Sequence, residues 1–490
     1  MKQPLLFFLS LFIFIAIQQP SALAQLRDIP VEVSGSFSVL GSGTETPFWH
    51  YAQTNGVVSP ESSVHQIGSI RAVVPFQHPG DRFDLSFGAE FTTRLSDASN
   101  TAHFQQLFGR ARLGKFILSA GRFHETIGWG PGLDPLTSGS MMVSNHATPI
   151  PKISLQTDGF IDVPWTGGVV SFQGRYSDGK LENDRFVSSP RLHQKSAYLK
   201  FTVGQISAVA GFIHNVVWAG EDEQRGRLPR GFGDYLDVVF GNSADPASGA
   251  TSSEMRNKLG NTVAAYDGGL MIGYGGWRFT GYRQIYLEDT VSLALRSFWD
   301  GLYGLGARRQ NGIGIINGVV YEFINTIRQD SQADYPRGRA NYYGHSVYRS
   351  GWTYHGNVLG NPLLTFDRDT DRMSNNMIIA HHVGVDGNIS QRLTYRAMST
   401  YTRNYGVCSD QIITGRCFIN SERPAPENLE TRPRSELRED QVSLLFEGSY
   451  LLLKQQQVHI ISSVAIDTGR FLGNRTGFML GVRLNDLMSL

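Results

Sequence analysis

Strand-like segments joined by connections that alternate between short and long constrain the fold of this chain most. In FDLSFGAEF, residues 83–91, apolar side chains occupy every second position, which is the period of a strand with one apolar face. The segments VSLLFEGSYLL, VHIISSVAI and FMLGVRL repeat this pattern near the C-terminus. Several segments are 9 to 12 residues long, and a tilted strand needs about 9–11 residues to cross a membrane. The pattern therefore predicts membrane-crossing strands.

The same pattern predicts eighteen strands and two unlike rims. The strands lie near residues 31–40, 67–76, 83–93, 105–113, 116–123, 153–161, 168–176, 196–204, 206–217, 262–274, 276–287, 302–309, 313–325, 377–388, 391–403, 440–453, 458–466 and 476–484. The long connections are 41–66, 94–104, 124–152, 177–195, 218–261, 288–301, 326–376, 404–439 and 467–475. Eighteen strands with both chain ends on one rim need eight short and nine long connections, which is the number counted.

Short turns on one rim and long loops on the other are typical of outer-membrane barrels. We predict an all-β fold, a transmembrane antiparallel β-barrel of about 18 strands whose long outer loops partly fill the lumen. A secreted multi-domain β-protein would instead show linkers and regular turn spacing. One helix is predicted over 289–302 (DTVSLALRSFWDGL), with Asp289 as N-cap, and it would cover or plug the barrel mouth.

The N-terminal residues predict export. Lys2, the apolar run LLFFLSLFIFIAI and the small-residue stretch SALA before Gln25 fit a secretory signal peptide over residues 1–24, which leaves residues 25–490 as the barrel. The formal net charge is +1, which gives no reason to expect nucleic acid as a partner. We expect a monomer in the outer membrane.

The sequence has two cysteines, Cys408 and Cys417, in VCSDQIITGRCF. In an exported protein an isolated close pair is expected to form one disulfide, here pinning an outer loop. A metal site would need further ligands at short spacing, and the neighbouring residues supply none.

Catalytic and metal motifs are weak. The sequence contains no H-E-x-x-H, P-loop or G-x-S-x-G pattern. DRDTDR, residues 367–372, resembles the start of a calcium loop but has Arg372 where glycine is required, so a solvated loop edge is favoured. His381 and His382 point to opposite faces of a strand, which favours a structural or lumen role. An esterase using Ser346 and His345 is a minor alternative. We predict no enzyme activity, cofactor or metal.

The long loops share mixtures of aromatic, glycine, arginine and asparagine residues. Rings can pack against sugar C–H faces, and arginine, asparagine and histidine can bind hydroxyls or carboxylates. The alternative is that the rings pack the loops into the lumen or form the interfacial girdle. The candidate polysaccharide-binding residues, expected to be partly exposed in loop 326–376 with two tryptophans as further candidates, are Tyr343, His345, Arg349, Trp352, Tyr354, His355, Trp129 and Trp218.

The same loops resemble the capsule assembly protein Wzi family in its Bacteroidetes-type form. The matching segments are ETIGWGPG, TSGSMMVSNHATPIPKIS, IDVPW, HNVVWAG, GDYLDVVFG, EFINTIRQ and RGRANYYGHSVYRSGWTYHGNVLGNPLL. The resemblance covers about residues 31–484 and implies an eighteen-strand outer-membrane barrel that associates with capsular or other exported polysaccharide without known enzyme activity. The best-known branch has a helical segment before the barrel, whereas VEVSGSFSVL here begins like a strand.

Two functions from different classes remain at this stage. The leading hypothesis is a lectin-like barrel that attaches or organises surface polysaccharide, with that polysaccharide and outer-membrane lipid as partners. The alternative is a passive porin, which requires an open lumen and ion conductance.

Overall fold

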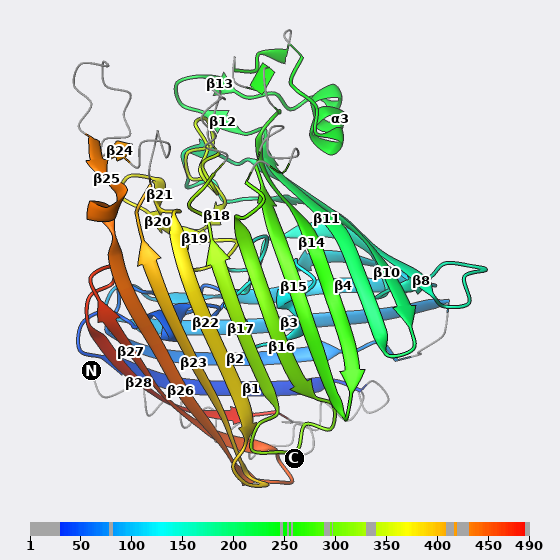
Figure 1. Cartoon of the computed structure of the whole chain (residues 1–490), viewed down its shortest axis with the longest axis vertical. Coiled ribbons are helices and arrows are strands. Elements are labelled where there is room, and N and C mark those ends of the chain that lie inside the picture. Colours follow the sequence, from blue (N-terminus) through cyan, green and yellow to red (C-terminus); the bar gives the residue numbers. More distant parts are fainter. Residues whose placement is uncertain are drawn as a thin grey trace.

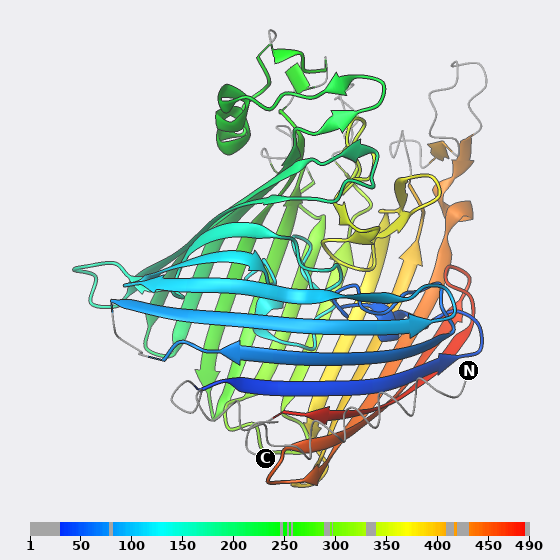
Figure 2. The same cartoon turned by 180° about the vertical axis from the view of Figure 1, so that it is seen from behind.

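The chain folds into a closed barrel whose first and last strands pair with each other (Figure 1, Figure 2). The computed structural model describes residues 30–77, 82–245, 248–251, 254–255, 258–288, 295, 297–329, 340–407, 416–418 and 431–485. Strand β1 (Glu32–Ser42) is antiparallel to β28 (Arg475–Leu484), with Gly35 opposite Leu484. The predicted strand at VEVSGSFSVL is therefore confirmed as the first strand of the barrel.

Eighteen antiparallel strand positions (staves) form the wall, as the sequence predicts. The others are β2 (Val64–Val74), β3 (Phe83–Ser96), β4 (Thr101–Leu113), β5 (Phe116–Arg122), β6 (Lys152–Thr157), β8 (Val170–Lys180), β10 (Arg191–Val203), β11 (Ile206–Trp218), β14 (Asn261–Tyr274), β15 (Trp277–Leu287), β16 (Gly301–Arg309), β17 (Gly318–Asn325), β22 (Ile378–Asn388), β23 (Leu393–Asn404), β26 (Glu439–Leu453) and β27 (Val458–Gly469). Strand β7 (Ile161–Asp162) continues β6 along the same neighbour, β8, so these two strands make one stave of the barrel sheet.

The loops carry only short elements. They are α2 (Phe48–Tyr51), η2 (Pro131–Leu133), β9 (Val187–Ser188), β12 (Glu221–Asp222), β13 (Gly226–Arg227), α3 (Phe232–Phe240), β18 (Thr353–Tyr354), β19 (Asn357–Val358), β20 (Thr365–Asp367), β21 (Arg372–Asn375), β24 (Arg416–Phe418), β25 (Thr431–Pro433) and η7 (Arg434–Leu437). Most of them gather on one rim (Figure 1), which we call the long-loop rim. The opposite edge, with connections such as 114–115 and 454–457, is the short-turn rim.

Several predicted boundaries are wrong, as three examples show. The connections predicted as long at 94–104 and 467–475 shrink to residues 97–100 and 470–474, because β3, β4, β27 and β28 pair further toward the long-loop rim. The predicted strand over 313–325 starts only at Gly318, where β17 begins to pair with β16.

The predicted helix over 289–302 is wrong at its C-terminal end. Residues 297–299 form a turn, and Leu302 belongs to β16, where it lies opposite Gln284 and is fully buried. Pairing with β15 outweighs the helical apolar pattern of this stretch, because the strand gains ladder hydrogen bonds and buries Leu302 in the lumen. Asp289 and residues 290–294 lie outside the described residues.

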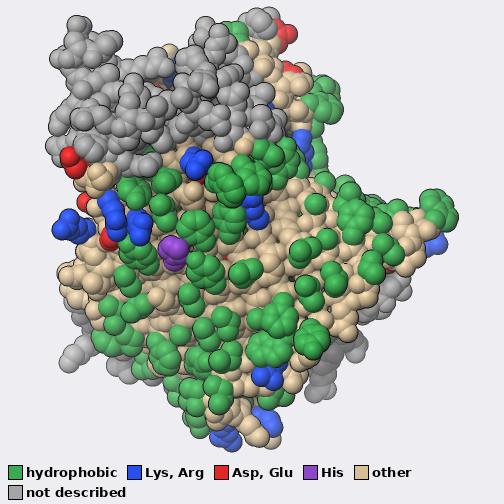
Figure 3. Space-filling view, viewed as in Figure 1, with side chains coloured by type: hydrophobic (Ala, Val, Ile, Leu, Met, Phe, Trp, Pro, Cys, Tyr) green, Lys and Arg blue, Asp and Glu red, His purple; other side chains and the backbone are tan. Residues whose placement is uncertain are grey.

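The outer wall is apolar. Side chains that alternate with buried ones along the strands are exposed, including Phe83 (58%), Phe87 (51%) and Leu107 (53%), and apolar side chains spread over the visible wall (Figure 3). Exposed apolar bands of this kind face the hydrocarbon of a membrane.

Within the described residues, no helix is long and apolar enough to cross a membrane.

The main core of the molecule lies inside the barrel. Loops 43–63, 123–151 and 340–377 fold inward, and their buried side chains pack against inward-facing side chains of the wall. We call these three loops the plug. The prediction that outer loops partly fill the lumen is confirmed, since one apolar cluster joins the plug to residues of β10, β15, β22 and β27.

Candidate binding site at the long-loop mouth

Polar side chains of the wall hold the plug by its backbone. Gln284 on β15 accepts the Met141 N–H with Oε1 at 2.9 Å, and Glu322 on β17 accepts the Ser138 N–H with Oε2 at 2.6 Å. A buried backbone N–H without an acceptor costs about 1–3 kcal/mol. These inward polar residues therefore satisfy backbone N–H groups of an irregular loop that has no sheet ladder there.

Trp129 is held to the wall in the same way. Its backbone N–H donates to Asp267 Oδ2 on β14 at 2.6 Å, and Asp267 also accepts the Tyr198 hydroxyl at 2.7 Å. The Trp129 side chain is 9% exposed and lies beside Gly269, where an added Cβ would come within 2.9 Å of the indole. The structure thus makes this candidate part of the packing between plug and wall.

The aromatic stretch around residue 352 is buried in the plug. Trp352 is 0% exposed and donates its Nε1–H to Met142 O at 2.7 Å; Tyr343 is also 0% exposed and donates its hydroxyl to Met141 O at 2.6 Å. Tyr354, 2% exposed, accepts a hydrogen bond from Arg122 at 3.0 Å. The expected exposure of these three rings is wrong, because each finds a polar partner inside the protein and gains more by burial.

Trp218 lies elsewhere. It is on the outward face of β11, since its neighbour Val217 points into the lumen and is buried in the main core. The indole is 1% exposed because the loop after β11, including Tyr235, covers it from outside the barrel. Sequence periodicity placed Trp218 at a strand end but gave no sign that this loop folds back over the wall.

The remaining candidates reach the mouth to different degrees. His345 is half-buried, and its Nδ1 accepts the backbone N–H of Val347 at 3.1 Å and of Tyr348 at 3.2 Å, while burial lowers the pKa of this imidazole to about 4. Arg349 is half-buried and lies over the Phe186 ring at 4.5 Å. His345 therefore acts as a neutral turn-stabilising acceptor.

His355 is exposed and separates two cavities on the long-loop rim. It has a left-handed backbone, φ 48°, which turns its side chain out at the β18–β19 hairpin. Its N–H donates to Glu182 Oε1 at 3.1 Å, and the pKa of its imidazole is lowered, chiefly because part of the ring is buried. Its expected exposure is confirmed.

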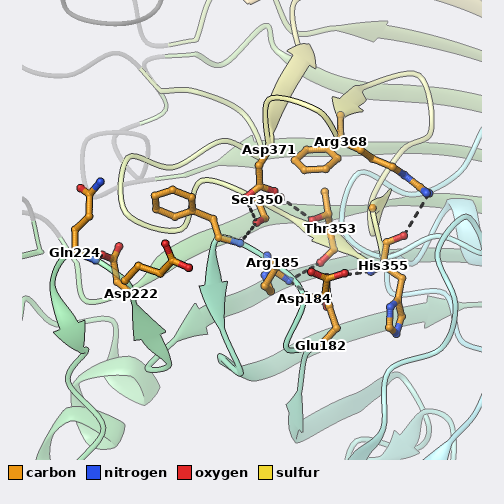
Figure 4. Close-up of a pocket in the computed structure, with 14 residues that line it drawn as sticks. Glu182, Asp184, Arg185, Asp222, Gln224, Ser350, Thr353, His355, Arg368 and Asp371 are labelled. Carbon is orange, nitrogen blue, oxygen red and sulfur yellow. Dashed lines mark hydrogen bonds and ion pairs between the residues drawn. The ribbon is translucent and has the colours of Figure 1, made fainter.

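The smaller cavity, about 500 Å³, is rich in carboxylates (Figure 4). We call it the acidic cavity; its charged lining residues are Glu182, Asp184, Asp222, Glu223, Asp371, Arg185 and Arg368. Arg185 holds two loops together, because its guanidinium donates to Gly351 O and Thr353 O at 3.0 Å each. Ser350 donates to Asp371 Oδ2 at 2.9 Å, so much of this lining is already engaged.

The larger cavity, about 930 Å³, lies at the meeting point of five connections on the long-loop rim. We call it the mouth cavity. Its charged lining residues are Arg94, Arg122, Arg368, Arg475, Glu45, Glu61, Asp367 and Asp369, and its ring-bearing ones are Tyr51, His103, His146, His355 and Phe366. Rings beside cationic and anionic groups over a closed floor can bind a polyhydroxylated or partly charged chain.

Arg368 occupies the wall shared by the two cavities. Its Nη2 donates to His355 O at 3.3 Å and to Asn357 Oδ1 at 3.4 Å, and about half of its side chain is exposed. Its role has no signal in the sequence, because DRDTDR resembles only the start of a calcium loop. Arg122, Arg94 and Arg475 carried no local signal, since each is a single charge near a strand end.

The aspartates of that stretch serve the loop itself. Asp367 accepts the Asp369 N–H at 2.9 Å and the Thr370 hydroxyl at 2.8 Å, which stabilises the β20–β21 hairpin. Among the described residues, no group of three or more His, Cys, Asp or Glu is arranged to hold a metal ion.

His381 and His382 point to opposite faces, as predicted. His382 is fully buried in the lumen, where Nε2 is 2.7 Å from Leu136 O and Nδ1 is 2.8 Å from Thr400 Oγ1. His381 contacts Tyr321 on the outer face, with Nδ1 2.9 Å from its hydroxyl.

The predicted disulfide cannot be placed in this fold: Cys408 lies outside the described residues, as does the side chain of Cys417, although β24 includes its backbone.

A closed antiparallel barrel with an apolar outer wall, a packed lumen and a cavity on its long-loop rim is an outer-membrane β-barrel with a plugged mouth. The family model described as capsule assembly protein Wzi matches residues 66–414, well over half of the chain. This chain belongs to the Wzi capsule assembly family.

One solved structure shares this fold at low sequence identity. The chain is similar to Wzi of Escherichia coli, an outer-membrane protein involved in group 1 capsule assembly and a carbohydrate-binding β-barrel, with 14% identity, TM-score 0.55 and coverage of 96% of this chain and 90% of that one. Two Pseudomonas aeruginosa proteins also match at 10% identity: OccK5 (OpdH), with TM-score 0.46 and coverage of 92% and 96%, and OpdL, with TM-score 0.45 and coverage of 92% and 97%. A comparison with curated protein sequences found no significant match.

Proposed function

We propose that this chain binds an exported polysaccharide in the mouth cavity and thereby attaches it to the outer membrane. The observation that carries the proposal is a polar cavity of about 930 Å³ on the long-loop rim, above a lumen closed by packed loops. Membership of a capsule assembly family and similarity to a carbohydrate-binding barrel support the same reading. Residues 1–24 would direct the chain to export.

The lining suggests how a sugar chain would be held. Arg368 and Arg122 present charge-assisted donors to hydroxyls or carboxylates, Glu61 and Asp369 accept from hydroxyls, and the half-buried Phe366 offers a ring to sugar C–H groups. Of the residues named from the sequence, His355 is the one that lines the cavity directly, while Tyr343, Trp352 and Tyr354 are buried in the plug.

The packed plug also favours attachment over passage. A porin needs a water-filled lumen, whereas here Tyr282, Trp352 and Met142 belong to one core that extends from wall to plug. In planar bilayers we therefore expect conductance far below that of an open eighteen-strand pore. We further propose that the site binds its ligand without chemical change.

The binding proposal is tested with purified protein in nanodiscs and the exported polysaccharide of the source cells. Arg368→Gln should weaken retention about 10- to 100-fold, because a hydrogen bond from a charged group contributes about 1.5–3 kcal/mol, and His355→Ala should weaken it less. Arg470→Gln is the matched control, since Arg470 is an exposed arginine of the same rim outside the cavity lining. Equal retention by Arg368→Gln and Arg470→Gln would reject the mouth cavity as the binding site.

A further inference from the structure

The loop after β11 places a short amphipathic helix against the outside of the barrel. Helix α3 starts where Asp234 accepts the Gly231 N–H at 2.7 Å and ends at Gly241, whose φ of 70° suits a helix C-terminus. Figure 1 shows α3 beside the upper ends of β10 and β11, away from the loops that carry β18 to β21.

Contacts with outward-facing strand residues fix this position. Tyr235 donates its hydroxyl to Asp178 Oδ2 at 2.8 Å, and its ring centroid lies 5.6 Å from that of Trp218. Lys195 on β10 donates to Val239 O. Asp178, Lys195 and Trp218 point away from the lumen, because their strand neighbours are the buried lumen residues of β8, β10 and β11.

The other side of α3 carries an exposed apolar stripe. Phe232 is 76% exposed, Leu236 39% and Phe240 72%, and a spacing of four residues puts them on one helix face. The helix adjoins the outward-facing Tyr176 on β8, which is 37% exposed and whose hydroxyl lies 2.5 Å from that of Tyr235. Continuity with this wall identifies the surroundings of the stripe as the leaflet at the long-loop rim.

A basic depression lies next to the helix. This cavity of about 680 Å³ is lined by Lys180, Arg191, Arg227 and Arg230, all exposed, with Ile153 of the apolar wall at its edge. Within the described part of the chain, none of these four cations forms an ion pair, and Arg191 lies over the Trp218 ring at 5.2 Å. Lys152 also lines the cavity, but it is buried and paired with Glu125. Two carboxylates, Asp178 and Glu221, also line it, and Asp178 is already engaged by His193 and Tyr235.

We propose that α3 and the basic depression form a binding site for phosphorylated lipid of the outer leaflet. The aromatic stripe inserts among acyl chains at the interface, as amphipathic helices do, and the basic side chains bind the headgroup phosphates. The site is independent of the mouth cavity, because it lies on the outward face of the wall and shares no lining residue with that cavity.

The test is native mass spectrometry of the full-length detergent-solubilised protein with bisphosphorylated lipid A and with its dephosphorylated form. Arg227→Gln/Arg230→Gln should weaken retention of the bisphosphorylated lipid about thirtyfold, or roughly fivefold per basic side chain. Phe232→Ser/Phe240→Ser should weaken retention of both forms about tenfold, because it removes apolar burial. Matched controls on the short-turn rim, Lys115→Gln/Lys454→Gln and Ile313→Ser/Ile315→Ser, should leave retention unchanged.

Three results would overturn the proposal. If all four variants retained both lipids as well as the wild type does, the site would not select lipid. Displacement of the lipid by inorganic phosphate, with no effect of Phe232→Ser/Phe240→Ser, would indicate a free-anion site. A wild-type dimer that becomes monomeric in that variant would identify a second copy as the occupant. Heat-modifiable gel migration and polysaccharide retention should stay at wild-type level in every variant, which separates this test from that of the mouth cavity.

Discussion

Replacing Trp352 by alanine should loosen the plug while leaving the barrel wall in place. The indole is fully buried and donates to Met142 O at 2.7 Å. Removal of a buried aromatic side chain costs about 3–5 kcal/mol, and the orphaned carbonyl adds about 1–3 kcal/mol. The wall should survive, because its strands pair around the full circle and do not depend on this side chain.

The loss should be visible as separate unfolding of the plug. Near-UV circular dichroism during heating and limited proteolysis of the folded protein report on the plug, and heat-modifiable gel migration reports on the wall. Trp352→Phe, which keeps most of the packing but loses the hydrogen bond, should cost only about 1–3 kcal/mol. Trp299→Ala is the control, since that tryptophan is 57% exposed. Unchanged protease resistance in Trp352→Ala would refute the role of this ring as the centre of the plug.

Three further outcomes follow from single sites. His146, buried beside the mouth cavity, has its pKa lowered to about 4, first by burial and then by Arg368. The unfolded chain therefore binds the proton more readily. The contribution of His146 to plug stability should be fully present above pH 6.5 and should fall by up to about 3 kcal/mol toward pH 4. Thermal melts of wild type and His146→Asn at both pH values measure the difference. Gly351→Ala should destabilise the plug by at least about 1 kcal/mol, because Gly351 has φ 61° and an added Cβ would lie 2.1 Å from a backbone oxygen; proteolysis rates would show this. Thiol labelling of the folded protein should find Cys408 and Cys417 unreactive, and their disulfide should contribute about 2–3 kcal/mol at most; two labelled thiols would disprove the pairing.

The wall was predictable because its physics is local. Residues 83–91 alternate between lipid and lumen at every position, and this period requires no knowledge of distant contacts. Strand ends were less predictable: Leu302 fits a helical face and a strand equally well, and only its partner Gln284 on β15 decides. The alternation of short and long connections is unaffected by these shifts of strand ends, because it depends only on the order of the connections along the chain.

The site was harder to predict because loop burial is a tertiary property. Trp352 and His355 are three residues apart in one aromatic stretch, yet Trp352 is fully buried and His355 is exposed. The difference comes from Met142, which is distant in sequence and accepts the indole N–H. Likewise, Trp218 is covered by Tyr235 from outside the wall, an arrangement that residue types alone do not encode.

The plug and the mouth cavity are mechanically linked, and this decides how binding data on variants must be read. Tyr354, buried within the plug, accepts a hydrogen bond from Arg122, which lines the cavity. A plug variant such as Trp352→Ala can therefore lower polysaccharide retention by displacing Arg122 without any contact between Trp352 and the sugar. Arg368→Gln removes a half-exposed charge that the plug core does not need, so loss of retention with intact protease resistance would locate the ligand directly. The two variants could instead lose polysaccharide retention and protease resistance in the same proportion. Retention would then depend only on the order of the plug, and the assignment of Arg368 as a ligand contact would fail.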